Sequence, residues 1–168
     1  MCFEAFERTI RSSALKKVAA HWFEARGAKS MPGWGDIRPS KITAQLPIIW
    51  SYVYDADGDA FTGRIAGSKI ETIFGKTLRG MPMRELYPAE HFDRLFERSK
   101  RVVCEPALYR GEGMVFRHLD HVGYGERITL PLARDGMHGD GLFGATDYQS
   151  FRTIQTDELP ETDDWFEL

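Results

Sequence analysis

The chain has 168 residues, the size of one ordinary domain with enough length to bury a hydrophobic core without disulfides or metals. Aliphatic and aromatic residues make up 42% of it and charged residues 28%, and no apolar run approaches the roughly 20 residues of a membrane span, so the composition predicts a soluble globular protein. A net charge of −3 and a pI near 6.0 argue against the strongly basic surface of a nucleic-acid-binding domain.

The N-terminus and the cysteines bear on the cellular compartment. Residues 1–13 contain Glu4 and Glu7 and lack the apolar stretch of a secretory signal. Cys2 and Cys104 are spaced like neither a metal site nor a redox pair, so free thiols are the simplest expectation. Both features favour a cytoplasmic protein.

An amphipathic helix is predicted near the N-terminus, within a flanking segment over residues 1–30. Between Arg8 and Arg26 apolar residues recur at the helical period, and Gly27 is placed to end the helix. The apolar stripe consists of Leu15, Val18, Trp22 and Phe23. A narrow stripe of this kind can pair with a second copy in a homodimer or pack on the sheet of its own chain.

A wrapping segment and a hairpin follow the helix. The stretch "KSMPGWGDIRPSKITAQLPIIW" has three prolines and two glycines in 22 residues, so it cannot form one regular element, although a short helix can begin at Pro39. Two strands are predicted by β-branched and aromatic residues over 48–55 and by alternation over 61–67. The "DADGD" between them is a turn sequence, which completes a β-hairpin.

Residues 68–104 return to helical spacing. The clearest helix begins at Pro88, with an apolar face on one side and two i,i+4 ion pairs on the other. The apolar face comprises Phe92, Leu95, Phe96, Val102 and Val103, and the pairs are Glu90 with Arg94 and Glu97 with Arg101.

Earlier in the same region, Gly75-Lys76-Thr77 matches the end of the phosphate-binding loop G-x-x-x-x-G-K-[ST]. That loop needs a first glycine where this chain has Ile70, and helical spacing precedes the triplet. We therefore interpret Gly75 as the end of a short helix and not as part of a nucleotide site.

Three strand-like stretches, 107–119, 125–133 and 141–151, follow the helical region. In the second of them apolar residues alternate with polar ones, which is typical of a sheet with one solvent-exposed face. The order of elements predicts an α+β fold with a five-stranded antiparallel sheet, a helical insert between strands 2 and 3, and helices gathered on one face. A pocket is expected where the insert lies over the sheet.

The last segment, 152–168, has one basic residue against six acidic ones. This composition predicts a flexible tail, and its terminal Trp165-Phe166 pair would suit folding on a partner or loose docking on the domain itself.

Three landmarks in fixed order resemble the PAS sensor domains, and in particular the short, mostly alphaproteobacterial PAS-like proteins in which this fold forms nearly the whole chain. They are "HWFEARGAKSMPGWGDIRPSKITAQLPIIW", "GRIAGSKIETIFGKTLRG" and "ERITLPLARDG". The likeness covers about residues 20 to 150 and implies a PAS-like domain over 31–151. One departure is Thr77, which stands where the family usually has an acid.

The resemblance implies a non-catalytic, stand-alone sensor or adaptor in bacterial signal transduction, which binds a small ligand, a signalling protein or both. A bound ligand would act by shifting the balance between two packings of the N-terminal helix or the insert. Two alternatives stay open: a pure interaction module with a filled core, and a small α+β enzyme in which His118 or Asp120 acts as general base. The sequence has no nucleophile elbow and no paired-carboxylate motif.

For the pocket, the residues predicted to bind a ligand are Tyr52, Arg64, Phe96, Phe116 and His118. His118 shares strand parity with Phe116, which makes it the best polar candidate. Arg64 lies in a hairpin strand, where a guanidinium can hold an anionic ligand or clamp a carboxylate of the insert. We favour the clamp.

No cofactor is identified by the sequence. His118 and His121 could share a metal only if the chain turns between them, and no further ligand set completes a site, so no metal is predicted. His91 lies on a helix, as the haem ligand of haem-binding PAS domains does, but no second feature supports haem. The Asn-Cys-Arg triplet of the flavin-adduct PAS domains does not occur.

Overall fold

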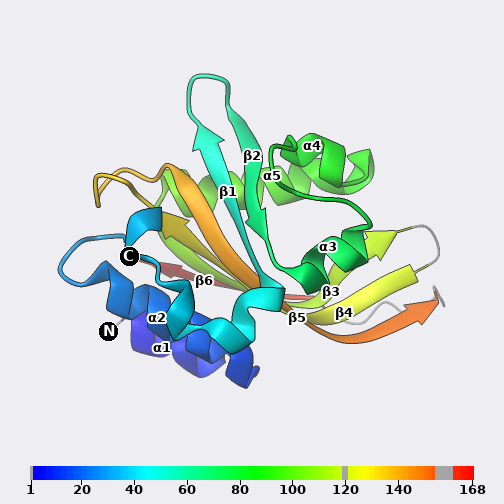
Figure 1. Ribbon diagram of the computed structural model, residues 1–168, viewed down its shortest axis with the longest axis horizontal. Coiled ribbons are helices and arrows are strands. Elements are labelled where there is room, and N and C mark those ends of the chain that lie inside the picture. The colour runs from blue at the N-terminus through cyan, green and yellow to red at the C-terminus, as the bar shows by residue number, and fades with distance from the viewer. Residues whose placement is uncertain (1, 119–120, 154–160) are drawn as a thin grey trace.

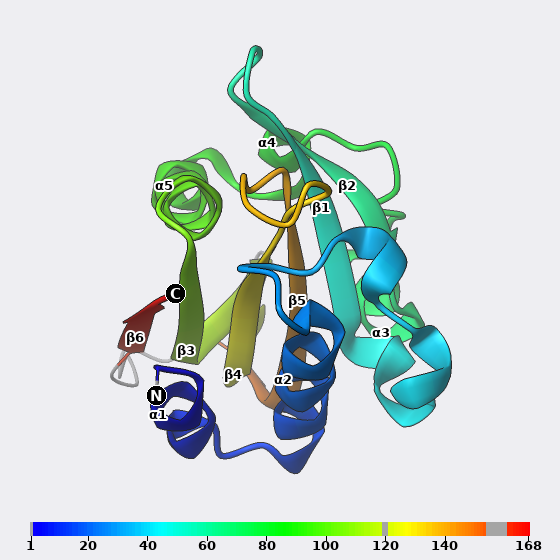
Figure 2. The same ribbon diagram turned by 90° about the vertical axis from the view of Figure 1, so that its left-hand side faces the viewer.

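The computed structural model describes residues 2–118, 121–153 and 161–168, with the backbone alone at 116–118, 121 and 151–153. Within this part of the chain, six strands form one antiparallel sheet with the order β2-β1-β5-β4-β3-β6 (Figure 1). The N-terminal helices cover one face of the sheet and the helical insert covers the other (Figure 2). The α+β class and the antiparallel sheet are therefore confirmed. The expectation that the helices gather on one face is wrong.

The N-terminal layer contains two helices where one was predicted over 8–26. They are α1 (Cys2–Thr9) and α2 (Ser13–Arg26), joined by a three-residue break. Ser12 makes this break because its hydroxyl accepts a hydrogen bond from the amide of Leu15 at 3.3 Å and caps α2. A serine cap in the middle of an apolar period starts a new helix there.

The wrapping segment forms three short 3₁₀ helices, η1 (Trp34–Asp36), η2 (Pro39–Lys41) and η3 (Thr43–Ile48). It leads into the predicted hairpin of β1 (Ile49–Asp55) and β2 (Ala60–Ala66).

The insert holds α3 (Ser68–Phe74), α4 (Met83–Leu86) and α5 (Ala89–Cys104). Gly75 ends α3 in the left-handed conformation, with φ of 68°, and its amide donates to the carbonyl of Glu71 at 2.8 Å. This is the helix end that the sequence predicted for "FGKT".

The remaining strands are β3 (Ala107–His118), β4 (His121–Leu132), β5 (Gly141–Thr153) and β6 (Thr162–Glu167). The last of these makes six strands where five were predicted. The prediction of a flexible tail over 152–168 is therefore wrong for Thr162–Glu167, because this stretch pairs antiparallel with the edge of β3.

Two aromatic neighbours fix β6 to the domain. Successive side chains of a strand point to opposite faces, so Trp165 and Phe166 reach different layers. The Trp165 ring lies 4.8 Å from the Tyr109 ring on the insert side, and the Phe166 ring lies 5.7 Å from the Phe6 ring of α1. Two aromatic contacts thus hold an acidic strand on the domain. The acidic composition of the segment gives no indication of these contacts.

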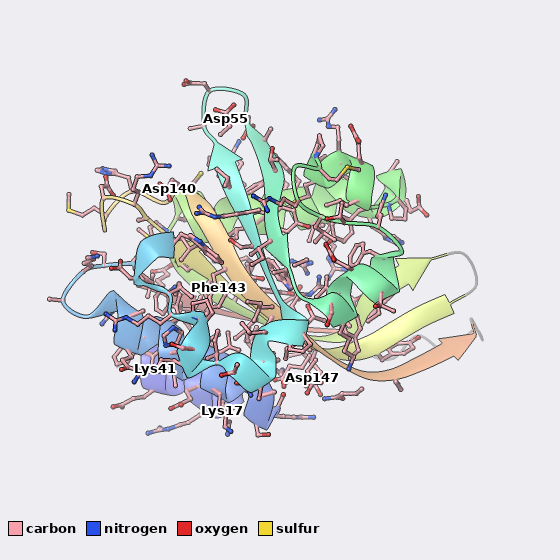
Figure 3. The ribbon with its side chains drawn as sticks, viewed as in Figure 1. Lys17, Lys41, Asp55, Asp140, Phe143 and Asp147 are labelled. Atoms are coloured by element: carbon pink, nitrogen blue, oxygen red, sulfur yellow. The ribbon has the colours of Figure 1, made fainter. Side chains whose placement is uncertain are left out.

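Two apolar cores result, one on each face of the sheet. Of the α2 stripe, Leu15, Val18 and Trp22 are fully buried, and the indole nitrogen of Trp22 donates to the carbonyl of Pro131 at 2.9 Å. Phe23 is half-buried and stacks on Phe3 of α1, with 4.1 Å between the ring centres. Figure 3 shows Phe143 on this side of the sheet, with Lys17 on the outer surface of α2. In β4, Ile128, Leu130 and Leu132 belong to this N-terminal core. The alternate residues Arg127 and Thr129 face the insert and not open solvent.

A buried ion network holds the N-terminal helices to the sheet. Glu126 is fully buried, and its carboxylate accepts from the amides of Arg11 at 2.9 Å and Ser12 at 2.7 Å and from Nε of Arg110 at 2.7 Å. Arg110 also pairs with Glu112 and, at 3.2 Å, with Asp164 of β6. Burial would lower the pKa of Arg110, but the hydrogen bonds to Glu126 and Glu112 raise it. One carboxylate thus joins the α1–α2 break, β3, β4 and β6.

Within the described residues, no helix is long and apolar enough to cross a membrane. The same residues hold no group of three or more His, Cys, Asp and Glu side chains that could bind a metal ion.

Replacing Glu126 by alanine is expected to destabilise the domain by about 3 kcal/mol, because it leaves two backbone amides without their acceptor and removes one of the three carboxylates that pair with the buried Arg110. Urea unfolding followed by circular dichroism measures this change. The matched control is Arg11→Gln, which breaks only the exposed pair with Glu112 and should cost less than about 1 kcal/mol. Equal losses in the two variants would contradict the central role of Glu126.

His21 predicts a pH dependence of stability. Burial is the main cause that lowers the pKa of His21 below 6.5. The charge of Glu24 acts in the opposite direction, and the charges of Lys41 and Arg38 lower the pKa further. The Nε2 of His21 accepts a hydrogen bond from the amide of Arg38 at 2.9 Å. A neutral ring is therefore part of the folded state. The stability that depends on it is fully present above the unfolded pKa of about 6.5 and falls as the pH drops through the lower folded pKa.

Thermal melts between pH 7.5 and 5 test this expectation. The wild type should lose more stability over this range than His21→Gln, which does not titrate and offers an acceptor oxygen in the same region. Parallel pH profiles for the two proteins would show that another group is responsible.

Candidate functional site

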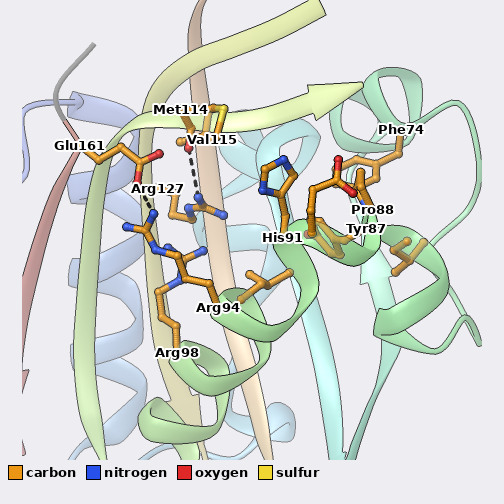
Figure 4. Close-up of a pocket in the computed structure, with 13 residues that line it drawn as sticks. Phe74, Tyr87, Pro88, His91, Arg94, Arg98, Met114, Val115, Arg127 and Glu161 are labelled. Carbon is orange, nitrogen blue, oxygen red and sulfur yellow. Dashed lines mark hydrogen bonds and ion pairs between the residues drawn. The ribbon is translucent and has the colours of Figure 1, made fainter. Parts of the chain in front are cut away.

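A cavity of about 260 Å³ lies between α5 and the sheet, where the insert passes over β3 and β4. Figure 4 shows residues from α3, α5, β3 and β4 converging on it, with Glu161 at one side. A smaller space of about 20 Å³ continues from it beneath Leu95 and Arg98 toward Tyr52 and Tyr148. Both spaces share Arg127, so they form the outer and inner parts of one site.

One end of the cavity is basic. Arg94 and Arg98 come from successive turns of α5, and Arg127 comes from β4 (Figure 4). Arg94 is 61% exposed at the mouth and pairs with Glu161 at 2.7 Å and Asp163 at 3.2 Å. The other two guanidiniums lie deeper, and no carboxylate of the described residues is within ion-pair distance of either.

The deeper arginines have neutral partners. Arg98 donates to the Tyr109 hydroxyl at 2.8 Å, which in turn donates to Asp163 at 2.6 Å. Arg127 donates to the carbonyl of Met114 at 3.4 Å. Burial, followed by the charge of Arg127, lowers the pKa of Arg98 to about 10. Arg98 therefore keeps its charge at neutral pH, in surroundings that disfavour that charge.

Two buried polar atoms of the cavity have no hydrogen-bond partner among the described residues. They are Nε of Arg127 and Nε2 of His91. In the inner space, the buried Tyr52 hydroxyl has only the Tyr87 hydroxyl beside it. Buried polar groups are normally hydrogen-bonded, since leaving one unsatisfied costs about 1–3 kcal/mol. The described part of the site therefore has unused hydrogen-bonding capacity.

Much of the remaining lining is apolar and aromatic. It comprises Phe74, Leu86, Tyr87, Leu95 and Val115. The β3–β4 pairing is irregular between Met114 and Phe116, and both Met114 and Val115 line the cavity there. Bulges of this kind re-aim side chains and are common beside functional sites.

A second cavity, of about 420 Å³, lies on the other side of β1, against the 33–36 turn. Arg64 lies there, with its guanidinium 4.7 Å from the ring centre of Trp34. The favoured clamp between Arg64 and a carboxylate of the insert is therefore wrong, because this side chain points to the N-terminal layer. Other charges of this cavity pair with one another, as Lys29 does with Asp36 at 2.6 Å.

The structure describes the side chains of three of the five predicted site residues, and of these three Tyr52 lies at the inner part of the cavity under α5. Phe96 packs on Phe61 and Phe92, at ring distances of 5.7 and 5.5 Å, and does not line the cavity. The side chains of Phe116 and His118 lie outside the described part of the chain, so their roles stay predictions.

Sequence reasoning missed the basic end of the site. Arg94 was interpreted as the outer half of an i,i+4 pair, and Arg127 as part of a solvent-exposed face. The alternation of β4 contained the information, because it places Arg127 and Thr129 on the face opposite the apolar core. The missing step was that the insert covers this face.

An antiparallel sheet with a helical insert closing over a ligand-sized cavity defines a sensor-type domain fold. A family model described as a PAS domain matches residues 10–146, and the chain belongs to this family. The resemblance seen in the sequence is confirmed. The comparison with curated proteins gives no match.

Replacing Tyr52 by phenylalanine is expected to leave the ligand-free domain as stable as the wild type or up to about 1 kcal/mol more stable, because this buried hydroxyl makes no well-formed hydrogen bond and has only the Tyr87 hydroxyl beside it. Chemical unfolding measures the difference. A loss of more than about 1 kcal/mol would mean that the hydroxyl has a stabilising partner in the folded protein.

Proposed function

We propose that this chain is a non-catalytic PAS-type sensor that binds a small molecule in the cavity under α5. PAS domains serve as signalling sensor or interaction modules, and the family of this chain supports that general role. The observation that carries the proposal is a cavity of about 260 Å³ lined by two buried polar atoms, Nε of Arg127 and Nε2 of His91, that have no partner among the described residues. A module with a filled core would have neither the space nor the unpaired groups.

Binding is proposed to reach the N-terminal helices through β6. Arg94 contacts Glu161 and Asp163 at the start of this strand, and the next residue, Asp164, pairs with Arg110. Arg110 in turn holds Glu126, which binds the amides of the α1–α2 break. These contacts give a continuous route from the cavity to the place where α1 and β6 lie side by side (Figures 1 and 2).

Such a route transmits a signal only if the ligand binds one arrangement of these elements more tightly than another. A guanidinium that turns toward a ligand loses its bond to β6, so occupied and empty cavities would favour different packings of β6 and the N-terminal layer. A signalling protein that contacts this edge would read the difference.

Several sequence-based expectations stay predictions beside this proposal. They are the protein partner, the homodimer, the cytoplasmic location and the absence of nucleic-acid binding. Most of the α2 stripe is buried within the chain, and the half-buried Phe23 stacks on Phe3, so a dimer through this stripe is not favoured. The enzyme alternative rests on His118 and Asp120, whose side chains lie outside the described part of the chain.

The proposal is tested by filling the cavity. Leu95 lines both parts of the site, so Leu95→Phe should weaken any cavity ligand by at least about tenfold, or about 1.4 kcal/mol. Leu46→Phe is the matched control, because this half-buried leucine packs on the opposite face. Native mass spectrometry of gently purified protein and a fragment screen by two-dimensional NMR, with acidic, basic and neutral compounds, measure binding.

We expect at least one compound to shift the signals of cavity residues in the wild type and in Leu46→Phe, and not in Leu95→Phe. A screen in which no class of compound perturbs the cavity, with no retained mass, would refute the sensor proposal.

A further inference from the structure

We propose that the ligand of this cavity is a small organic anion, a carboxylate with a short apolar body, and that Arg98 and Arg127 bind its carboxylate group. This inference rests on the proposed function, since it assigns a chemical class to the molecule that the cavity binds. Nothing in the family assignment specifies that class.

The charges of the site give the first argument. Buried cations in proteins are normally paired with an acid, because an unpaired charge loses its hydration without compensation. Arg98 and Arg127 both line the cavity, and each donates only to a neutral oxygen of the described residues, the Tyr109 hydroxyl and the Met114 carbonyl. An anion between them would supply the missing partner for both.

An unsatisfied donor gives the second argument. Nε of Arg127 is buried and has no partner among the described residues, and a guanidinium binds a carboxylate best through two parallel N–H groups. A carboxylate has two oxygens with about four acceptor positions, which suits the N–H groups of two guanidiniums better than a single hydroxyl or carbonyl does. Nε2 of His91 is a further buried polar atom of this cavity, and it donates to the same anion when the ring carries its proton there (Figure 4).

The shape and the apolar wall define the rest of the ligand. Figure 4 shows Phe74 and Tyr87 on the side of the cavity away from the arginines, so the ligand has a hydrocarbon or aromatic part opposite its charge. The volume of about 260 Å³ is below the roughly 300–1,000 Å³ of sites for drug-sized molecules. A short-chain or monocyclic acid fits these limits, whereas inorganic phosphate would leave the apolar wall uncovered.

Calorimetric or NMR titration with four probes tests the inference. Sodium hexanoate and sodium benzoate carry both parts of the proposed ligand, hexanamide keeps the body without the charge, and inorganic phosphate keeps a charge without the body. All titrations are made at one ionic strength. We expect hexanoate or benzoate to bind, and hexanamide and phosphate to bind at least about tenfold more weakly.

The variants Arg98→Gln and Arg127→Gln should each weaken carboxylate binding by at least about tenfold. Arg79→Gln is the matched control, because Arg79 is an exposed arginine of the same insert that does not line the cavity. Melting temperatures separate binding from folding. Removing one of two neighbouring like charges should leave the ligand-free protein no less stable, so a variant that loses binding and keeps its melting temperature supports the inference.

Each other outcome counts against it in a distinct way. Equal binding of hexanoate and hexanamide, unchanged in both arginine variants, would leave the sensor proposal intact and overturn the anionic class. Phosphate binding as tightly as hexanoate would show a general anion site and overturn the organic acid. If Arg98→Gln does not fold because it loses its bond to Tyr109, Arg127→Gln still decides the question, since Arg127 gives up only one long hydrogen bond.

Discussion

A buried ion pair between Arg110 and Glu126 is the constraint on which both the fold and the site depend. Taking two charges out of water costs several kcal/mol per ion, and their attraction offsets this cost only when further hydrogen bonds surround the pair. Glu126 accepts from two backbone amides as well as the guanidinium, and the three nitrogens of that guanidinium each contact a carboxylate. The positions of the N-terminal helices and of β6 are therefore coupled to each other through the centre of the sheet.

The same pair determines which face of β4 meets the insert. Side chains of a strand alternate, so fixing Glu126 toward the N-terminal helices sends Arg127 to the opposite face. A shift of one residue in register would bury Arg127 among the apolar residues of α2 and turn Glu126 into the cavity. One face of the sheet is thus filled with apolar side chains, whereas the other face carries the basic end of a cavity.

Local patterns predicted the parts of the fold that local chemistry decides. The hairpin follows from its turn sequence, α5 from its apolar period, and the end of α3 from Gly75. The sixth strand escaped prediction because its acidic composition is that of a tail, and it is stabilised by contacts to Tyr109 and Phe6, which are more than 50 residues away in sequence. The basic end of the site escaped for a similar reason. Each arginine looks like a surface residue in its own element, and only the closure of the insert over β4 brings the three together.

The pairing of these arginines runs opposite to what stability alone would favour. Desolvation makes an unpaired charge most costly in the interior, so a structural network should give its deepest cation the best partners. Here Arg94, at the exposed mouth, has two carboxylates, while Arg98 has a hydroxyl and Arg127 a single long bond to a carbonyl. A structural role accounts for Arg94, because its ion pairs hold β6 to α5. It accounts in part for Arg98, which is linked to Asp163 of β6 through the Tyr109 hydroxyl. It does not explain Arg127, which contacts neither β6 nor an acid of the described residues. Functional sites are where a sequence departs from the rules that the rest of its fold follows. The weak pairing of Arg127 is a departure of this kind, and it is the reason for proposing a binding site here.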